Sequence, residues 1–260
     1  MLTEAQVAEF RANGFLNGGL AIGDAEVELL REELARVIEH QNELERKPVQ
    51  IVNLSGKPDA PVWQVVNIWE ASDAYRELMG NRKIVEEIAQ LTDASQLRIW
   101  HDQIQYKPAQ VGGVNGWHQD APLWPIIRPM TEVSAWVALD DVDESNGCMS
   151  MVPGSHLWGD KINFLWTVQK FDGMPSEFEG HPVQVKLCPV RKGEVHYHHA
   201  LTWHGSHANH SGRPRRAIAF HYMLGDTRYV ASGEHPMKPF VEVADGEILR
   251  GTHFPQVYPV

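Results

Sequence analysis

The sequence has few cysteines, no long apolar run and a shortage of basic side chains. Its two cysteines, Cys148 and Cys188, are too few for a disulfide framework, which favours a reducing compartment. No apolar run approaches the roughly 20 residues of a membrane span. The opening MLTEAQVAEF lacks the basic start and apolar core of a signal peptide, so we expect a cytoplasmic protein. With 23 basic and 34 acidic residues the net charge is −11, which argues against nucleic acid or a membrane surface as partner.

Histidine and tryptophan are the residues present in excess. Six of the 14 histidines lie between positions 195 and 210. The nine tryptophans suggest a roomy pocket walled with flat rings, although core packing explains any single tryptophan equally well. The length of 260 residues suits one well-buried domain, and neither a repeat nor a linker divides it. We therefore expect a single domain over 1–260, with a mostly helical part at 1–95, a strand-rich core at 96–225 and a C-terminal extension at 226–260.

The N-terminal part has the signals of helices. Thr3 and Gln6 form a capping-box pattern, and Gly14 is a typical stop for the helix between them. Asp24 can cap a second helix, because apolar residues recur at helical spacing from position 27 to position 38. Shorter helices are expected near 72–79 and 82–91, and the stretch 47–61, which contains proline and glycine, is expected to be a loop.

From position 96 onward the pattern changes to short strands with turns between them. Strands are expected at 97–107, 133–139, 148–152, 183–187, 194–199, 200–204 and 215–224. The irregular, aromatic segment 157–182 and the stretch 63–69 are candidate lids over a site. Helices followed by many short strands predict a mainly β fold with flanking α-helices, a double-stranded β-helix of the jelly-roll, cupin-like kind.

One short motif contains candidate metal ligands. His118 and Asp120 lie two positions apart after a glycine-rich loop, so on a strand both side chains point to the same face. A second imidazole, such as that of His204 before the sharp Gly205-Ser206 stop, would complete two histidines and one carboxylate around a metal, the set found in non-haem Fe(II) oxygenases. The competing interpretation is that the pair sits at the exposed end of a strand and that the histidine-rich segment is a solvated loop.

Several motifs in order resemble the phytanoyl-CoA dioxygenase family of Fe(II)/2-oxoglutarate-dependent oxygenases. They are LTEAQVAEFRANGF at the start, WHQD, SAWVALDDVDESNGCMSMVPGSH, KGEVHYHHALTWHGS and RPRRAIAFHY. The resemblance spans roughly residues 1–225 and is strongest over 95–222. It implies Fe(II), 2-oxoglutarate and dioxygen as cofactors, and His118, Asp120 and His204 as iron ligands. It also implies that Arg215 binds the distal carboxylate of 2-oxoglutarate, that Ser206 assists this binding and that Trp136 packs along the co-substrate.

Other residues are also candidates for the site. Arg213 and Arg216 are rivals for the carboxylate, and strand alternation separates Arg216 from Arg215 without choosing between them, so the resemblance chooses Arg215. His101, Gln103 and Gln105 share one face of a strand; His101 or Gln103 is a candidate contact for 2-oxoglutarate, with Gln105 and Lys107 nearer solvent. His199, where the family often has a histidine behind the ligands, and Trp117, Trp124 and Arg128 complete the expected pocket and its surroundings. The remaining histidines of this region, His196, His198, His207, His210 and His221, are expected not to be ligands.

The implied reaction is hydroxylation of a C–H bond with release of succinate and carbon dioxide. Relatives that halogenate have a small residue where this chain has Asp120, which argues against halogenation. A small or medium-sized metabolite fits a chain without a basic patch, and family likeness does not transmit the substrate. Two alternatives stay open: a cupin-like metalloenzyme that does not use 2-oxoglutarate, and a non-catalytic jelly-roll binding protein. The oligomeric state does not follow from the sequence.

Overall fold

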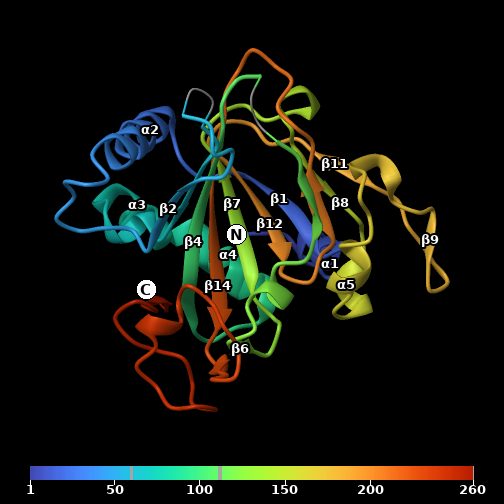
Figure 1. The fold of residues 1–260 in the computed structure, drawn as a ribbon. Coiled ribbons are helices and arrows are strands. Elements are labelled where there is room, and N and C mark those ends of the chain that lie inside the picture. Colours follow the sequence, from blue (N-terminus) through green and yellow to red (C-terminus); the bar gives the residue numbers. More distant parts are fainter. Residues whose placement is uncertain (59–60, 111–112, 260) are drawn as a thin grey trace.

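Two antiparallel β-sheets form the centre of the protein (Figure 1). The structure is a computed structural model that describes residues 1–58, 61–110 and 113–259. The larger sheet has the order β1 (Phe15–Leu20), β12 (Glu194–His199), β7 (Val133–Ala138), β14 (Arg215–Leu224), β4 (Leu97–Lys107), β3 (Trp63–Val66) and β2 (Gln50–Asn53), with β16 (Gln256–Tyr258) also pairing with β4. The smaller sheet has the order β11 (Lys186–Cys188), β8 (Met149–Met151), β13 (His204–Ser206) and β5 (Asn115–His118). This arrangement confirms the predicted jelly-roll fold.

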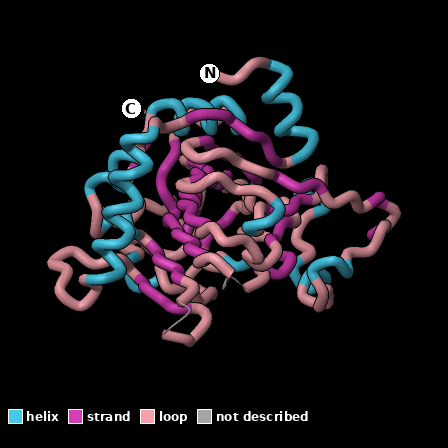
Figure 2. Tube along the Cα trace, turned by 90° about the horizontal axis from the view of Figure 1, so that it is seen from above, coloured by secondary structure: helices cyan, strands magenta, loops and turns pink. Residues whose placement is uncertain are grey.

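Helices cover the outer face of the larger sheet (Figure 2). They are α1 (Glu4–Asn13), α2 (Asp24–Glu39), α3 (Asp73–Met79) and α4 (Arg82–Thr92). Alternation along β14 explains the contact, because Ile218, Phe220 and Tyr222 point outward into the apolar core beneath these helices. The intervening Ala217 and Ala219 point to the opposite face, toward the smaller sheet. Among the residues that the structure describes, no helix has the length and hydrophobicity needed to cross a bilayer.

The helix ends follow the sequence signals closely. The Thr3 side chain accepts a hydrogen bond from the Gln6 backbone N–H, and Gly14 ends the helix in the left-handed region at φ 82°. A Cβ on Gly14 would lie 2.5 Å from Nδ1 of His156, so only glycine fits there. The prediction that Asp24 caps the second helix is wrong by one residue. Gly23 is the cap, and its N–H donates to the Glu26 carboxylate, while Asp24 is the first helical residue.

Three strands were missed in the N-terminal part. β1, β2 and β3 belong to the larger sheet, and β2 lies within the stretch predicted to be a loop. The prediction for 63–69 as a lid is also wrong, since β3 pairs with β4 in register Gln64 to Gln105. These strands are short and lack clear alternation of polar and apolar residues. Long-range pairing therefore stabilises them rather than local preference. Residues 59–60 of the predicted loop 47–61 lie outside the part of the chain that the structure describes.

Two predictions for the C-terminal half need correction. The expected strand 200–204 is a turn closed by the Thr202 N–H on the His199 carbonyl, and β13 begins only at His204. The segment 157–182 is not an unstructured lid but contains α5 (Ile162–Leu165), β9 (Glu177–Phe178) and β10 (His181–Pro182). Its apolar side chains pack on Trp117 of β5 and on Trp203, the residue just before β13. A further two-stranded ladder joins β6 (Ile127–Arg128) to β15 (Arg228–Tyr229).

Glu132, just before β7, is a buried carboxyl whose two oxygens have no hydrogen-bond partner among the described residues. Burial raises the pKa of Glu132 to about 8; Asp120 and Asp226 add to this effect, while the Glu132 backbone N–H and Arg128 oppose it. The ionised form therefore destabilises the folded state.

The Glu132→Gln variant is expected to remove a pH-dependent loss of stability. A carboxyl with a pKa of 4.5 when unfolded and about 8 when folded stabilises the fold fully below pH 4.5 and loses that contribution as the pH rises through 8. Glutamine has the same shape and does not titrate. The metal-free variant should melt roughly 5 °C above wild type at about pH 8.5 and within about 2 °C of it near pH 5. Calorimetry with a chelator present measures this, and a difference independent of pH would contradict it.

Candidate active site

His118, Asp120 and His204 converge at one corner between the two sheets. His118 on β5 and His204 on β13 are directly paired across neighbouring strands, and their ring centres are 4.1 Å apart. The Asp120 Oδ1 lies 3.6 Å from Nε2 of His118 and 3.5 Å from Nε2 of His204. One donor atom from each of the three residues fits within 4.8 Å of the others, the spacing of atoms around a single ion. The structure thus brings together the three side chains that the motif singled out.

The protonation of these side chains suits a divalent metal. Nδ1 of His118 faces the Gly116 carbonyl at 2.8 Å, and Nδ1 of His204 faces the Thr202 carbonyl at 2.9 Å. Each Nδ1 therefore carries the proton, and each Nε2 directs a lone pair into the corner. Burial, with His204 adding, lowers the pKa of His118 to about 4, so its imidazole is neutral. Burial alone would raise the pKa of Asp120, but the His204 imidazole and the hydrogen bond from His198 hold it well below its usual range.

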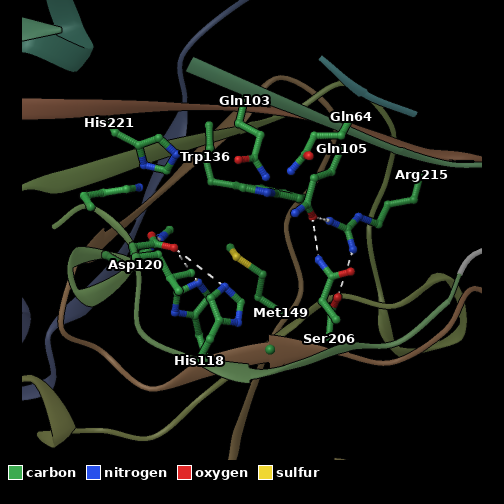
Figure 3. A pocket seen from close by; sticks show the side chains of 17 residues that line it. Gln64, Gln103, Gln105, His118, Asp120, Trp136, Met149, Ser206, Arg215 and His221 are labelled. Carbon is green, nitrogen blue, oxygen red and sulfur yellow. Dashed lines mark hydrogen bonds and ion pairs between the residues drawn. The ribbon is translucent and has the colours of Figure 1, made fainter. Parts of the chain in front are cut away.

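A cavity of about 250 Å³ opens beside this corner (Figure 3). Its wall on the larger sheet consists of rows of residues that face each other across β12, β7, β14 and β4. One row holds Trp136, Ala219 and Gln103, and the next holds Gln105 opposite Gln64. The small side chain of Ala219 next to Trp136 leaves room for a ligand over the ring. Met149, Ser206 and Asn115 of the smaller sheet form the opposite wall.

Arg215 lies at the far end of the cavity as a buried cation. Its side chain is 1% exposed, and no carboxylate of the described residues pairs with it. Its guanidinium donates to the Gly147 carbonyl, the Ser206 hydroxyl and the Gln105 amide oxygen, while Nε has no partner. Burial lowers the pKa of Arg215 to about 10, which still leaves it charged. An unpaired buried cation is costly, so this end of the cavity favours an anion.

Lys107, opposite Arg215 on β4, was expected near solvent, but the structure buries it. Its amine donates to the Ser206 hydroxyl at 2.9 Å and to the His207 carbonyl at 3.0 Å. Burial, with Arg215 adding, lowers the pKa of Lys107 to about 6, so this group is largely neutral at pH 7. Lys107 therefore fixes the Ser206 hydroxyl beside Arg215 without adding a second full charge.

The structure separates the other sequence candidates into two groups. Gln103, Gln105 and Trp124 line the cavity as expected. Four candidates do not: His101, Trp117, Arg128 and His199. His101 lies behind His221 at a ring distance of 4.7 Å, and the indole N–H of Trp117 donates to the Phe171 carbonyl on the other side of the smaller sheet.

The remaining two candidates are held by local contacts away from the cavity. The Arg128 guanidinium donates to the Ile127 carbonyl, and Nδ1 of His199 accepts the Leu201 N–H. His199 lies on the face of β12 opposite to His198, since neighbouring residues alternate. The expectation that His199 orients a ligand is therefore wrong.

Sequence reasoning did not single out several lining residues, among them His198, His221 and Gln64. His198 and His221 both lie opposite Ser134, on the strands that flank β7. The sequence contained part of the information, because strand alternation places His198 on the same face as His196, and Ser134 on the same face as Trp136. Only the pairing of β12 with β7 aligns these two faces.

Comparison with known proteins agrees with this geometry. A family model described as Phytanoyl-CoA dioxygenase (PhyH) matches residues 10–217. The peroxisomal phytanoyl-CoA dioxygenase of Rattus norvegicus is 24% identical over 258 residues, which cover 91% of this chain and 74% of that protein. The carbocyclase SnoK of nogalamycin biosynthesis, a non-heme alpha-ketoglutarate-dependent enzyme, superposes with a TM-score of 0.78 at 25% identity, over 98% of this chain and 96% of that one. The epimerase SnoN, in complex with Fe³⁺, alpha-ketoglutarate and nogalamycin RO, shares the fold with a TM-score of 0.74 at 23% identity, over 98% of both chains.

Proposed function

Because this chain belongs to the phytanoyl-CoA dioxygenase family, we propose that it hydroxylates a C–H bond of a small or medium-sized metabolite. Family membership makes it a 2-oxoglutarate-dependent oxygenase that uses Fe(II), 2-oxoglutarate and dioxygen. One observation supports the assignment to this cavity above all. The donor atoms of His118, Asp120 and His204 share a corner, and the unpaired guanidinium of Arg215 lies at the other end of the same cavity.

In this proposal the two ends of the cavity have separate tasks. His118, Asp120 and His204 hold Fe(II) by two nitrogens and one oxygen, a set that leaves positions open. When bound, Fe(II) supplies the oxidation of substrate by dioxygen, coupled to decarboxylation of 2-oxoglutarate to succinate and carbon dioxide. Arg215 binds the distal carboxylate of 2-oxoglutarate through its planar donor groups, and Ser206 assists. Trp136 contacts the carbon chain between the two ends.

The substrate side of the cavity is neutral and rich in amides. Gln64 and Gln103 point into the open space (Figure 3), and Trp124 and Leu123 flank it. Apart from its histidines, no ionisable side chain other than Asp120 and Arg215 lines the cavity among the described residues. A metabolite with hydrogen-bonding groups and little charge fits this wall. SnoK is a carbocyclase and SnoN an epimerase, so product analysis is needed to identify the outcome on this chain.

We also propose that 1–260 acts as one catalytic domain. The larger sheet joins strands from the N-terminal part, β1 to β3, with strands of the core and with β16 near the C-terminus. The cavity takes Gln64 from the N-terminal part and its other lining residues from the core.

The experiment that tests the function is formation of succinate. Purified protein with Fe(II), ascorbate and 2-oxoglutarate should release succinate slowly, and a true substrate from a metabolite panel should raise the rate and gain one oxygen atom. Omitting 2-oxoglutarate or adding a chelator should stop turnover. Turnover that continues without 2-oxoglutarate would favour a cupin-like metalloenzyme. Protein that binds no iron when purified without oxygen would favour a non-catalytic binding module.

A further inference from the structure

The two oxygens of the Asp120 carboxylate have different neighbours. Oδ1 faces the ligand nitrogens of His118 and His204 at 3.6 and 3.5 Å. Oδ2 points the other way, 3.2 Å from Nε2 of His198 and 3.4 Å from the Ser134 hydroxyl. One oxygen is therefore free for a metal, while the other is engaged by the larger sheet.

The position of His198 is set by the sheet and not by a loop. His198 pairs with Ser134 across β12 and β7, and Ser134 pairs with His221 across β7 and β14. The Ser134 hydroxyl also lies 2.6 Å from Nδ1 of His221. These residues form a polar row on the inner face of three neighbouring strands, directly beneath Asp120.

The contacts of His198 show which of its two ring nitrogens donates to Asp120. The side chain is buried, and its Nδ1 has no hydrogen-bond partner among the described residues. An ionised carboxylate only accepts hydrogen bonds. The 3.2 Å contact therefore needs an N–H on Nε2 of His198, which donates to Oδ2 of Asp120.

We propose that His198 is the positioning residue that presents Asp120 to the metal through Oδ1 alone. The inference rests on the proposed function, because it needs Asp120 to be a ligand. By occupying Oδ2, the His198 N–H prevents the carboxylate from turning to give both oxygens to the ion. A carboxylate that bound through both oxygens would fill a position that the co-substrate needs. Ser134 supports the same oxygen from the side of β7.

His198→Phe and His196→Phe form a matched pair for the test. Phenylalanine keeps a flat ring in a buried space but removes the N–H. His196 lies two residues away on the same face of β12, is equally buried at 2% exposure, and stacks on Phe15 instead of contacting Asp120. His198→Gln restores a donor near the place of Nε2. The probe is Co(II), which binds such sites at least as tightly as Fe(II) and resists oxidation.

Titration calorimetry with Co(II) and the visible spectrum of the bound ion are the two readouts, and thermal unfolding reports the fold. We expect His198→Phe to weaken Co(II) binding by about 10- to 100-fold and to change the spectrum, as removal of such partners usually does. His196→Phe should match wild type, and His198→Gln should recover most of the affinity.

Three results would overturn the inference. Co(II) affinity of His198→Phe within about threefold of wild type would show that the N–H is not needed. Equal weakening in both phenylalanine variants would show an effect of packing alone. Wild type that binds no Co(II), or Asp120→Ala that binds it as well as wild type, would instead contradict the proposed metal site and the inference with it.

Discussion

Replacement of Asp120 by alanine is expected to eliminate iron binding and turnover while leaving the fold intact. The variant removes the single negative charge of the corner and leaves two neutral imidazoles. Removing a metal ligand should weaken iron binding more than removing a residue that only contacts a ligand. We therefore expect iron affinity to fall by more than about a hundredfold. The Asp120 backbone N–H bond to the Ala200 carbonyl does not involve the side chain and persists. Iron content after anaerobic loading, succinate formation and the melting temperature measure the three effects.

Asp143→Ala is the matched control for this loss. Asp143 is a half-exposed carboxylate that pairs with Arg213 on the surface. Its removal should leave iron content and succinate formation unchanged. An Asp120→Ala protein that retained iron in stoichiometric amount and turned over at the wild-type rate would contradict the proposed ligand set. The same would follow if both variants lost iron equally.

Exchange of Arg215 for lysine is expected to raise the KM for 2-oxoglutarate by about 10- to 100-fold, although the charge is kept. Arginine offers a planar pair of donors that matches a carboxylate, and an ammonium group does not. Loss of one charge-assisted hydrogen bond costs about 1.5–3 kcal/mol. The side chain already donates to Gly147 and Ser206. A shorter lysine abandons these contacts as well. Succinate formation as a function of 2-oxoglutarate concentration measures the change.

Arg216→Lys provides the control on the same strand. Arg216 is the next residue on β14, and its guanidinium pairs with Asp140 on the opposite face. This variant should lower the melting temperature by breaking a two-point ion pair and should leave the KM for 2-oxoglutarate unchanged. If Arg216→Lys raised that KM as much as Arg215→Lys, the assignment of the carboxylate to Arg215 would be wrong. An unchanged KM in both variants would show that another group binds the distal carboxylate of 2-oxoglutarate.

Local sequence signals predicted most of the helices and the long strands. The bounds of β4 and β14 agree with the predicted ranges 97–107 and 215–224, because these long runs end at proline or glycine. The helices near 72–79 and 82–91 also formed where expected. Strands β1, β2 and β3 escaped prediction, since short strands are stabilised by neighbours that are distant in the sequence.

The candidate site was likewise predictable from the sequence only in part. The spacing of His118 and Asp120 predicted one shared strand face, but β5 ends at His118 and Asp120 lies just beyond it in a helical backbone conformation. The two side chains therefore meet through a turn and not through strand alternation. The choice between His198 and His199, or between Gln103 and His101, required more than alternation. His101 and Gln103 do share a face, but only Gln103 lies in the row that meets the cavity.

The sequence by itself determined the chemical groups of this protein: two imidazoles, a carboxylate and a guanidinium. The tertiary structure alone decided which further side chains surround them, such as His198 beneath Asp120 and Lys107 beside Ser206. The physical reason is that alternation fixes only which residues share a face. The register between strands far apart in the chain fixes which faces meet, and that register depends on the packing of the whole sheet.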